Sequence, residues 1–274
     1  AYAEALGPVD KGFINMMLLV INTSRLYNAM GCSAHIQRAY LVARSYGNWR
    51  EAFGQPIGRF PMVKESLAYL KTDAEACLAG TWLLAGLQER LEQGHANAQE
   101  KAFFRVALNL NKVQSAKVAH AAINRAIQVL GGNGAIESFS VLPRLLRDNV
   151  VYENWEGTHN VLLLQVLKDC KKMGLHEGFF AFLEERLGSK SVGAVRQNFL
   201  GLLDQPSAIA TLNLHPIGEQ MATLVQLAGL QMAGEQTLPT MRLVGRRYLA
   251  GSVVRDEAYL ALLDACLGPA SGDD

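Results

Sequence analysis

Apolar residues recur at helical spacing along most of the 274-residue chain. Three long stretches, residues 12–46, 62–93 and 98–130, carry them three or four positions apart, as in helices that bury one face. No stretch shows the alternation with a period of two that marks a half-buried strand. The pattern therefore predicts an all-α protein. Shorter helices are predicted at residues 138–146, 158–173, 179–187, 192–203, 218–233 and 243–267.

Small residues are interleaved with the apolar ones in the first long stretch, which favours closely packed helices. They are Ala29, Gly31, Ala34, Ala39 and Ala43. We therefore predict an up-and-down four-helix bundle in residues 1–173. A smaller helical extension is predicted to follow in residues 174–274, where breaks at 200–206 and 237–239 separate its helices.

Composition narrows the class of protein without identifying it. Hydrophobic residues make up 50% of the chain and charged residues 19%, which is typical of a soluble globular protein. The formal net charge of +1 gives no strong field that would recruit nucleic acid or an acidic membrane. Apolar runs are too short to span a bilayer, and neither a signal peptide nor an initiator Met is present. We expect a cytoplasmic protein, of which this chain is a fragment.

The cysteines and histidines do not form a recognisable metal motif. Cys32, Cys77, Cys170 and Cys266 are scattered, with no CxxC pair, and the six histidines include no HExxH. Scattered cysteines of this kind predict buried free thiols in a reducing compartment. No metal site is expected.

The stretch 147–160 carries the strongest candidate chemistry. After an Arg-Asp pair at a predicted helix end we expect an irregular segment, then Glu156 beside Trp155, and then the apolar run 161–164. The hydroxyl of Thr158 is predicted to cap the helix that contains this run. Partial desolvation beside the indole would raise the pKa of Glu156 toward that of a general base. From these residues alone, a surface glutamate in a turn is the simpler interpretation.

Two other segments are rich in glycine. Residues 50–63 contain two glycines and two prolines and predict a loop between helices. Residues 128–134 read Gln-Val-Leu-Gly-Gly-Asn-Gly and end the third long stretch, where one glycine is expected at a helix C-terminus. No strand precedes these glycines, so they are not a dinucleotide-binding loop. The helix end explains one of the three glycines but not the other two.

Together the three stretches resemble the signatures of the acyl-CoA dehydrogenase family, over residues 12–169. The resemblance implies that Glu156 removes the α-proton of an acyl-CoA substrate while a β-hydride passes to FAD. Some members of the family place the base before an arginine on the first long helix. Here Ser24 precedes Arg25 and cannot act as a base, which supports Glu156. Arg25 and Gly157 are implied to contact the substrate.

The same resemblance implies a set of cofactor contacts. Part of the set would reach the FAD of a neighbouring subunit, which implies a homodimer or a homotetramer. The sequence departs from the family at Asn160, where a Gln is usual, and at Ala135, where an aromatic residue is usual. The implied FAD contacts are Arg50, Phe53, Gln128, Gly131, Gly132, Thr158 and Asn160.

The extension is similar to that of the adaptive-response flavoprotein branch, which is induced by DNA alkylation. The family's amino-terminal helical domain and β-barrel are absent from this chain, so we expect the isolated segment to bind FAD weakly and to be inactive. In the intact enzyme, electrons would pass to a separate acceptor.

The alternative is a flavoprotein with little dehydrogenase activity that binds DNA or a protein through this extension. A plain oligomerisation scaffold is a third possibility. We do not expect nucleic-acid binding, because acidic residues offset the extension's basic cluster and a solvated helix face is the simpler interpretation. The basic cluster is Arg242, Arg246, Arg247 and Arg255.

Overall fold

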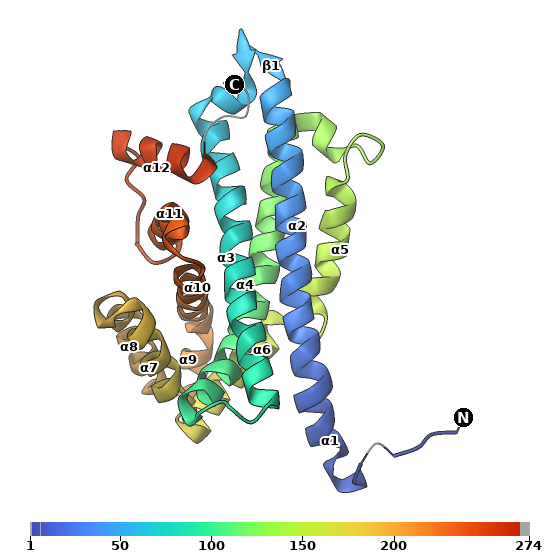
Figure 1. The fold of residues 1–274 in the computed structure, drawn as a ribbon, viewed down its shortest axis with the longest axis vertical. Helices are drawn as coiled ribbons and strands as arrows, with labels where there is room; N and C mark the ends of the chain where they lie inside the picture. The colour runs from blue at the N-terminus through green and yellow to red at the C-terminus, as the bar shows by residue number, and fades with distance from the viewer. Residues whose placement is uncertain (1, 6, 269–274) are drawn as a thin grey trace.

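Four antiparallel helices form the body of the molecule. The computed structural model describes residues 2–5 and 7–268, and over these residues it is almost entirely helical. The bundle helices run alternately up and down, which confirms the predicted architecture (Figure 1). They are α2 (Asn22–Trp49), α3 (Pro61–Glu92), α4 (Ala98–Leu130) and α5 (Leu142–Asn154).

Shorter elements precede and connect these helices. Turns η1 (Val9–Lys11), α1 (Gly12–Asn15) and the π-helical η2 (Met16–Ile21) lead into α2. A two-stranded hairpin joins α2 to α3, with Glu51 paired to Pro56 and Ala52 to Gln55. The connecting elements are β1 (Glu51–Ala52), β2 (Gln55–Pro56), η3 (Ile57–Arg59) and, after α4, η4 (Gly131–Ala135).

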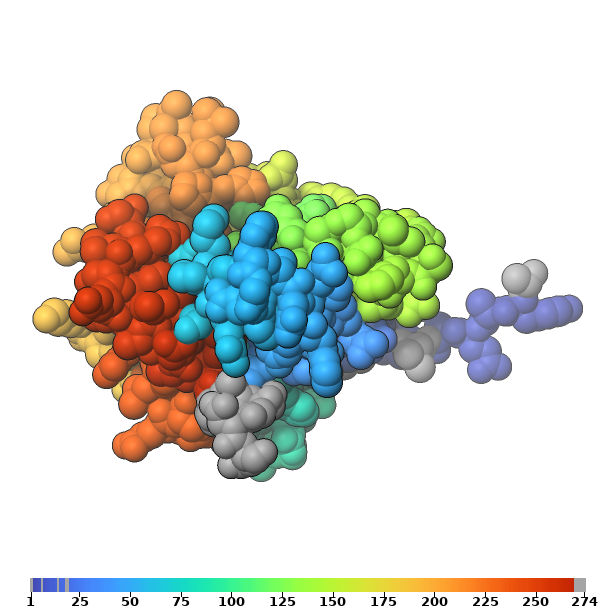
Figure 2. Space-filling model, turned by 90° about the horizontal axis from the view of Figure 1, so that it is seen from above, coloured from blue at the N-terminus to red at the C-terminus, as the bar shows by residue number. Residues whose placement is uncertain are grey.

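The extension packs against one side of the bundle. Helix α7 lies on α4, α10 lies on α3 and α4, and α12 lies on α3. Seen from above, the extension and the green η4–α5 region flank the α2–α3 hairpin on opposite sides (Figure 2). The elements after α5 are α6 (His159–Met173), α7 (Leu175–Leu187), α8 (Ser189–Leu203), α9 (Ser207–Leu212), α10 (Leu214–Ala233), η5 (Glu235–Thr237), α11 (Leu238–Tyr248) and α12 (Glu257–Leu267).

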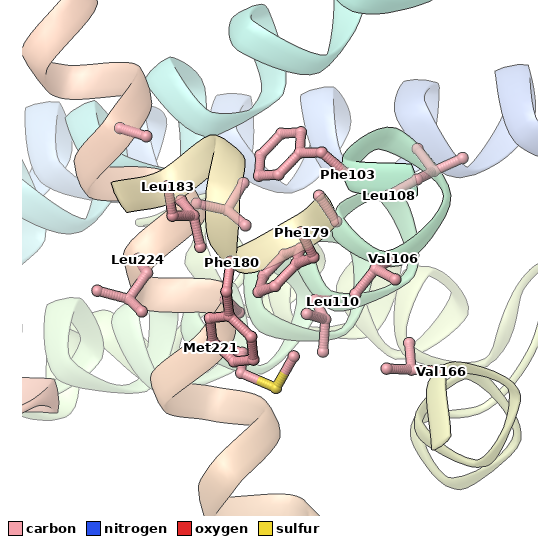
Figure 3. Packing of buried hydrophobic residues seen from close by; sticks show 14 of the residues in the cluster. Phe103, Val106, Leu108, Leu110, Val166, Phe179, Phe180, Leu183, Met221 and Leu224 are labelled. Atoms are coloured by element: carbon pink, nitrogen blue, oxygen red, sulfur yellow. The ribbon is translucent and has the colours of Figure 1, made fainter. Parts of the chain in front are cut away.

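One hydrophobic core joins the bundle to the extension. Phe103 of α4 stacks on Phe182 of α7, with ring centres 3.8 Å apart. The ring centre of Phe179 lies 5.5 Å from that of Phe103, and Figure 3 shows these two residues in the shared core. All three side chains are fully buried or nearly so. Burying an aromatic side chain of this size stabilises a fold by a few kcal/mol. The extension therefore completes the core of the bundle.

The predicted small residues allow close helix contacts. A Cβ added to Gly31 would lie 2.8 Å from the ring and hydroxyl of Tyr152, so Gly31 leaves room for this side chain of α5 against α2. The four cysteines are buried and free, as the sequence predicts. Among residues 2–5 and 7–268, no helix is both long enough and apolar enough to cross a membrane.

The structure corrects two predicted boundaries. Helix α5 continues through residues 147–154, where an irregular segment was expected, because the buried Asn149 takes an apolar position on its inner face and donates to Ala116 O at 3.1 Å. The stretch 243–267 is two helices, since residues 249–256 leave the helical conformation between α11 and α12.

Candidate functional site

The connection between α5 and α6 holds an unusual backbone conformation. Glu156 has a φ of 58° and Gly157 a φ of 109°. Glycine tolerates positive φ, but a glutamate there is strained by about 1–3 kcal/mol and needs support from its surroundings. The carboxylate-bearing residue singled out by the sequence is therefore also one of the few non-glycine residues with positive φ in the described chain.

Arg25 supports this connection from α2. Its guanidinium is buried, with 5% of the residue exposed. Nε donates to the carbonyl oxygen of Glu156 at 3.2 Å, and Nη1 donates to Asn109 Oδ1 at 2.8 Å. Burial lowers the pKa of Arg25, and the charge of Glu156 opposes that shift. Arg25 thus holds the backbone of Glu156 from a position that is almost fully shielded from solvent.

Lys112 supports the connection from α4. Its side chain is fully buried, and Nζ donates to Glu153 O at 3.0 Å and to Gly157 O at 2.9 Å. Burial lowers the pKa of this amine to about 8. Lys112 was not among the predicted site residues, although its position in α4 carries a signal. It continues the helical stripe of Ala116 and Ile123, a stripe predicted to be buried.

Glu153, in the last turn of α5, belongs to a polar cluster. Its Oε1 lies 2.7 Å from His120 Nδ1 and accepts from Asn149 Nδ2 at 3.2 Å. These contacts fix the end of α5 against α4. They also give His120 the partner that the sequence did not reveal.

Trp155 is fastened to α2 and leaves much of its surface open. Its indole N–H donates to Ser24 Oγ at 3.0 Å, and 57% of the residue is exposed. The residue at the family's alternative base position therefore serves as a hydrogen-bond acceptor. Glu156 itself is half-buried.

The start of α6 differs from the prediction in one respect. Thr158 occupies the N-cap position, but its side chain is exposed and makes no capping hydrogen bond, so the predicted hydroxyl cap is wrong. Solvent competes for a hydroxyl at such an exposed position. Asn160 Oδ1 lies 2.7 Å from His215 Nε2 on α10, so the extension touches this site directly.

The remaining cofactor candidates gather at the far end of the bundle. Arg50 and Phe53 lie in the hairpin at the upper end of Figure 1, well away from the α5–α6 connection. Phe53 is 97% exposed. The turn η4 lies at this same end, where Asn133 Nδ2 donates to the hydroxyl of Tyr46 at 3.1 Å. Gln128, in the last turn of α4, is exposed.

The three glycines of η4 serve different needs. Gly131 has a φ of 62°, and a Cβ at Gly134 would lie 2.6 Å from Ile127 O. Gly132 has neither positive φ nor any atom within 4 Å of an added Cβ. Nothing within the described chain requires glycine at position 132, which leaves the backbone there open to close approach by another molecule.

Comparison with known proteins identifies the domain that carries these features. Residues 10–170 match the family described as acyl-CoA dehydrogenase, C-terminal domain. The chain belongs to the acyl-CoA dehydrogenase family.

Relatives place this acyl-CoA dehydrogenase chain near particular members. It is 31% identical over 168 residues to acyl-CoA dehydrogenase family member 11 of Caenorhabditis elegans, covering 61% of this chain and 27% of that protein. It is 30% identical over 172 residues to the putative acyl-CoA dehydrogenase AidB of Escherichia coli K12, covering 63% and 30%. The chain thus spans less than a third of the length of either relative.

Solved structures extend the similarity beyond the matched domain. The apo-form of Bd2924 superposes with a TM-score of 0.75 at 30% identity, covering 82% of this chain and 44% of that one. Caenorhabditis elegans ACDH-11 in complex with C11-CoA superposes with a TM-score of 0.70 at 24% identity, covering 90% and 42%. At that identity the second likeness shows the fold alone. In both superpositions the covered share of this chain is larger than residues 10–170 alone could supply. The extension is therefore part of the shared fold as well.

The basic cluster of the extension is not an open phosphate-binding face. Arg247 is buried in a pair with Asp73, and Arg255 pairs with Glu65. Of the four arginines in the cluster, Arg242 and Arg246 form no ion pair within residues 2–5 and 7–268. No group of metal-ligating side chains occurs among these residues either.

Proposed function

We propose that this chain is the C-terminal part of an FAD-dependent, acyl-CoA dehydrogenase-like oxidoreductase in which Glu156 is the catalytic base. The supporting observation is the strained backbone of Glu156, which Arg25 and Lys112 brace from two different helices. With the neighbouring carbonyls engaged inside the protein, the carboxylate is the part of Glu156 that remains available for a substrate.

The proposed reaction converts an acyl-CoA thioester to its α,β-unsaturated form. The Glu156 carboxylate takes the α-proton, and the β-hydrogen leaves with its electron pair as a hydride. FAD supplies the hydride acceptor when bound, and an external acceptor reoxidises it. Arg25 and Gly157 would orient the loop at the substrate, Arg25 through its bond to Glu156 O.

The cofactor residues fall into two groups that fit two different FAD molecules. Thr158 and Asn160 lie beside Glu156 and would contact the FAD of the same active site. Arg50, Phe53, Gln128, Gly131 and Gly132 lie at the opposite end and would reach the FAD of a neighbouring subunit. The exposed Arg50 suits a pyrophosphate, and the open backbone at Gly132 suits close approach.

This division requires a homodimer or a pair of homodimers. Exposed apolar residues at the hairpin end, among them Trp49 at 85% and Met62 at 82%, are consistent with burial in an assembly. Because the chain covers under a third of its relatives, we expect it to bind FAD weakly when isolated. Tight FAD binding and turnover would belong to the longer protein.

Glu156→Gln tests the proposal in the full-length, FAD-loaded protein. The amide keeps the size of the side chain, so folding and FAD content should stay unchanged. It cannot accept the α-proton at neutral pH, so acyl-CoA turnover with an artificial acceptor should fall by about 10²–10⁴-fold. Glu137→Gln, an exposed glutamate paired with Arg147, is the matched control and should keep full activity.

Two outcomes would count against this function. Wild-type turnover by Glu156→Gln would remove Glu156 from the role of base. Failure of both wild type and variant to turn over any acyl-CoA, while both hold FAD, would favour a non-enzymatic flavoprotein that binds a macromolecule.

A further inference from the structure

Lys112 is a buried cation that makes no direct ion pair among the described residues, although the charges of Glu153 and Glu156 act on it. It is fully buried in α4, and it forms no ion pair within the described chain. Placing an ammonium away from water costs several kcal/mol unless polar partners compensate. The hydrogen-bond partners of its Nζ are two backbone carbonyls, Glu153 O and Gly157 O. A buried apolar side chain would avoid this cost, so the amine has to contribute something that packing alone does not.

The two carbonyls stand on either side of Glu156. Glu153 lies in the last turn of α5, where helix carbonyls lack partners within the helix and a cation is favourable. Gly157 follows Glu156 directly and has positive φ. Arg25 Nε binds the carbonyl of Glu156 between them. Three carbonyls within five residues are therefore held by two buried cations.

We infer that Lys112 is a positioning residue that sets the direction of the Glu156 carboxylate through the backbone on both sides of it. It does not touch the carboxylate, and it acts by keeping the segment 153–157 in a conformation that Glu156 would not adopt on its own. Without the ammonium, the segment is free to relax toward negative φ at position 156, which displaces the side chain. The catalytic consequence rests on the proposed function, whereas the bracing of the loop does not.

The test uses the full-length, FAD-loaded protein with Lys112→Met, which keeps the unbranched stem and removes the donors. We expect kcat to fall by about 10²-fold with KM changed less than threefold, because misplacing a catalytic group by about 1 Å has an effect of that size. Hydrogen exchange at the amides of residues 155–158 should become at least tenfold faster. Lys117→Met is the matched control on the same helix, since Lys117 is partly exposed and pairs with Glu219 at 3.9 Å. It should change neither measurement.

The two measurements separate this inference from the proposed function. If Glu156→Gln remains active but Lys112→Met speeds hydrogen exchange at residues 155–158, Lys112 does hold the loop. In that case Glu156 is not the base. If Lys112→Met leaves exchange and kcat at wild-type values, Lys112 does not position the loop.

Lys112→Gln, which retains shorter donors, replaces Lys112→Met if the latter does not fold, and it should show the same changes. Failure of both variants to fold, while Lys117→Met folds, would make Lys112 a residue of general stability and would overturn the inference.

Discussion

The bundle and the extension bury different kinds of side chain. Around the α5–α6 connection the bundle buries Arg25, Asn109, Lys112 and Asn149, each with 5% or less of its surface exposed. The helices of the extension bury mainly aromatic and aliphatic residues, with Phe180 tilted 56° against Phe199 at 6.0 Å. Buried polar groups reduce stability unless they are fully paired. Other polar side chains are buried elsewhere, among them Asn111, Gln114 and Gln226, but these four lie around one connection and hold it at a cost in stability.

The extension is bound to the bundle by a charged contact as well as by the shared core. Both nitrogens at the end of Arg247 donate to the carboxylate of Asp73, at 2.7 and 3.0 Å. The guanidinium carbon lies 3.7 Å from the centre of the Tyr69 ring. Burial lowers the pKa of Arg247, but Asp73 more than offsets this and leaves the pKa raised. The contact joins α11 to α3 where both side chains are almost free of solvent.

The largest predicted effect follows from removing the Arg247–Asp73 ion pair. Arg247→Met leaves Asp73 charged and buried without a cationic partner, with only the hydroxyl of Tyr248 still donating to it, which should reduce the free energy of unfolding by about 3–5 kcal/mol. Urea denaturation followed by circular dichroism measures it. The exposed Arg255, which pairs with Glu65, provides the control, because Arg255→Met should shift the midpoint little. If Arg247→Met and Arg255→Met shift the urea midpoint equally, the buried Arg247–Asp73 pair is not what joins the extension to the bundle.

Most of the fold could be predicted because the long helices have regular apolar spacing, and some of their ends lie at proline or glycine, as at Pro61 and Gly131. Helix α2 passes Gly47 and ends at Trp49, three residues beyond the predicted end. Helix α4 begins and ends where the spacing does, and α3 differs by one residue at each end. Helix α5 was missed in part because a polar residue, Asn149, fills an inward position. Local spacing cannot reveal that Ala116 O, on another helix, accepts from Asn149 Nδ2.

A local motif in the sequence singles out the segment of the candidate site in which the backbone is unusual. Glu156 and Gly157 stand together in the sequence, and the structure gives both residues positive φ. Lys112 and Arg25 were harder to place, because their partners are backbone carbonyls 41 to 131 positions away. Such partners carry no side-chain signature. The separation of Arg50 and Glu156 to opposite ends likewise follows from the bundle topology and not from any short pattern.

A second prediction sharpens the comparison by titrating His159, a half-buried polar group at the start of α6, the helix that packs against α4. Burial and, next, the charge of Lys112 lower the pKa of His159 to about 4, compared with about 6.5 in an unfolded chain. Between these values the unfolded state binds the proton more tightly, so stability should rise as the pH increases from 4 to 6.5. His159→Gln should flatten that rise in urea midpoints. Proton NMR of the His159 ring should place its titration near pH 4, and a midpoint near 6.5 would refute the prediction.

The smallest predicted effect concerns two helix starts that look alike in sequence. Asn97 caps α4 with a complete capping box, in which its side chain accepts from Glu100 N at 2.8 Å and Glu100 Oε2 accepts from Asn97 N at 2.9 Å. Thr158 holds the same position on α6 without any capping bond. Asn97→Ala should therefore lower the free energy of unfolding by about 1 kcal/mol. Thr158→Ala should leave it unchanged within the error of a urea titration. A loss of similar size in Thr158→Ala would show that the Thr158 hydroxyl caps α6 in solution. The start of α6 would then form a hydrogen bond that is absent from the structure.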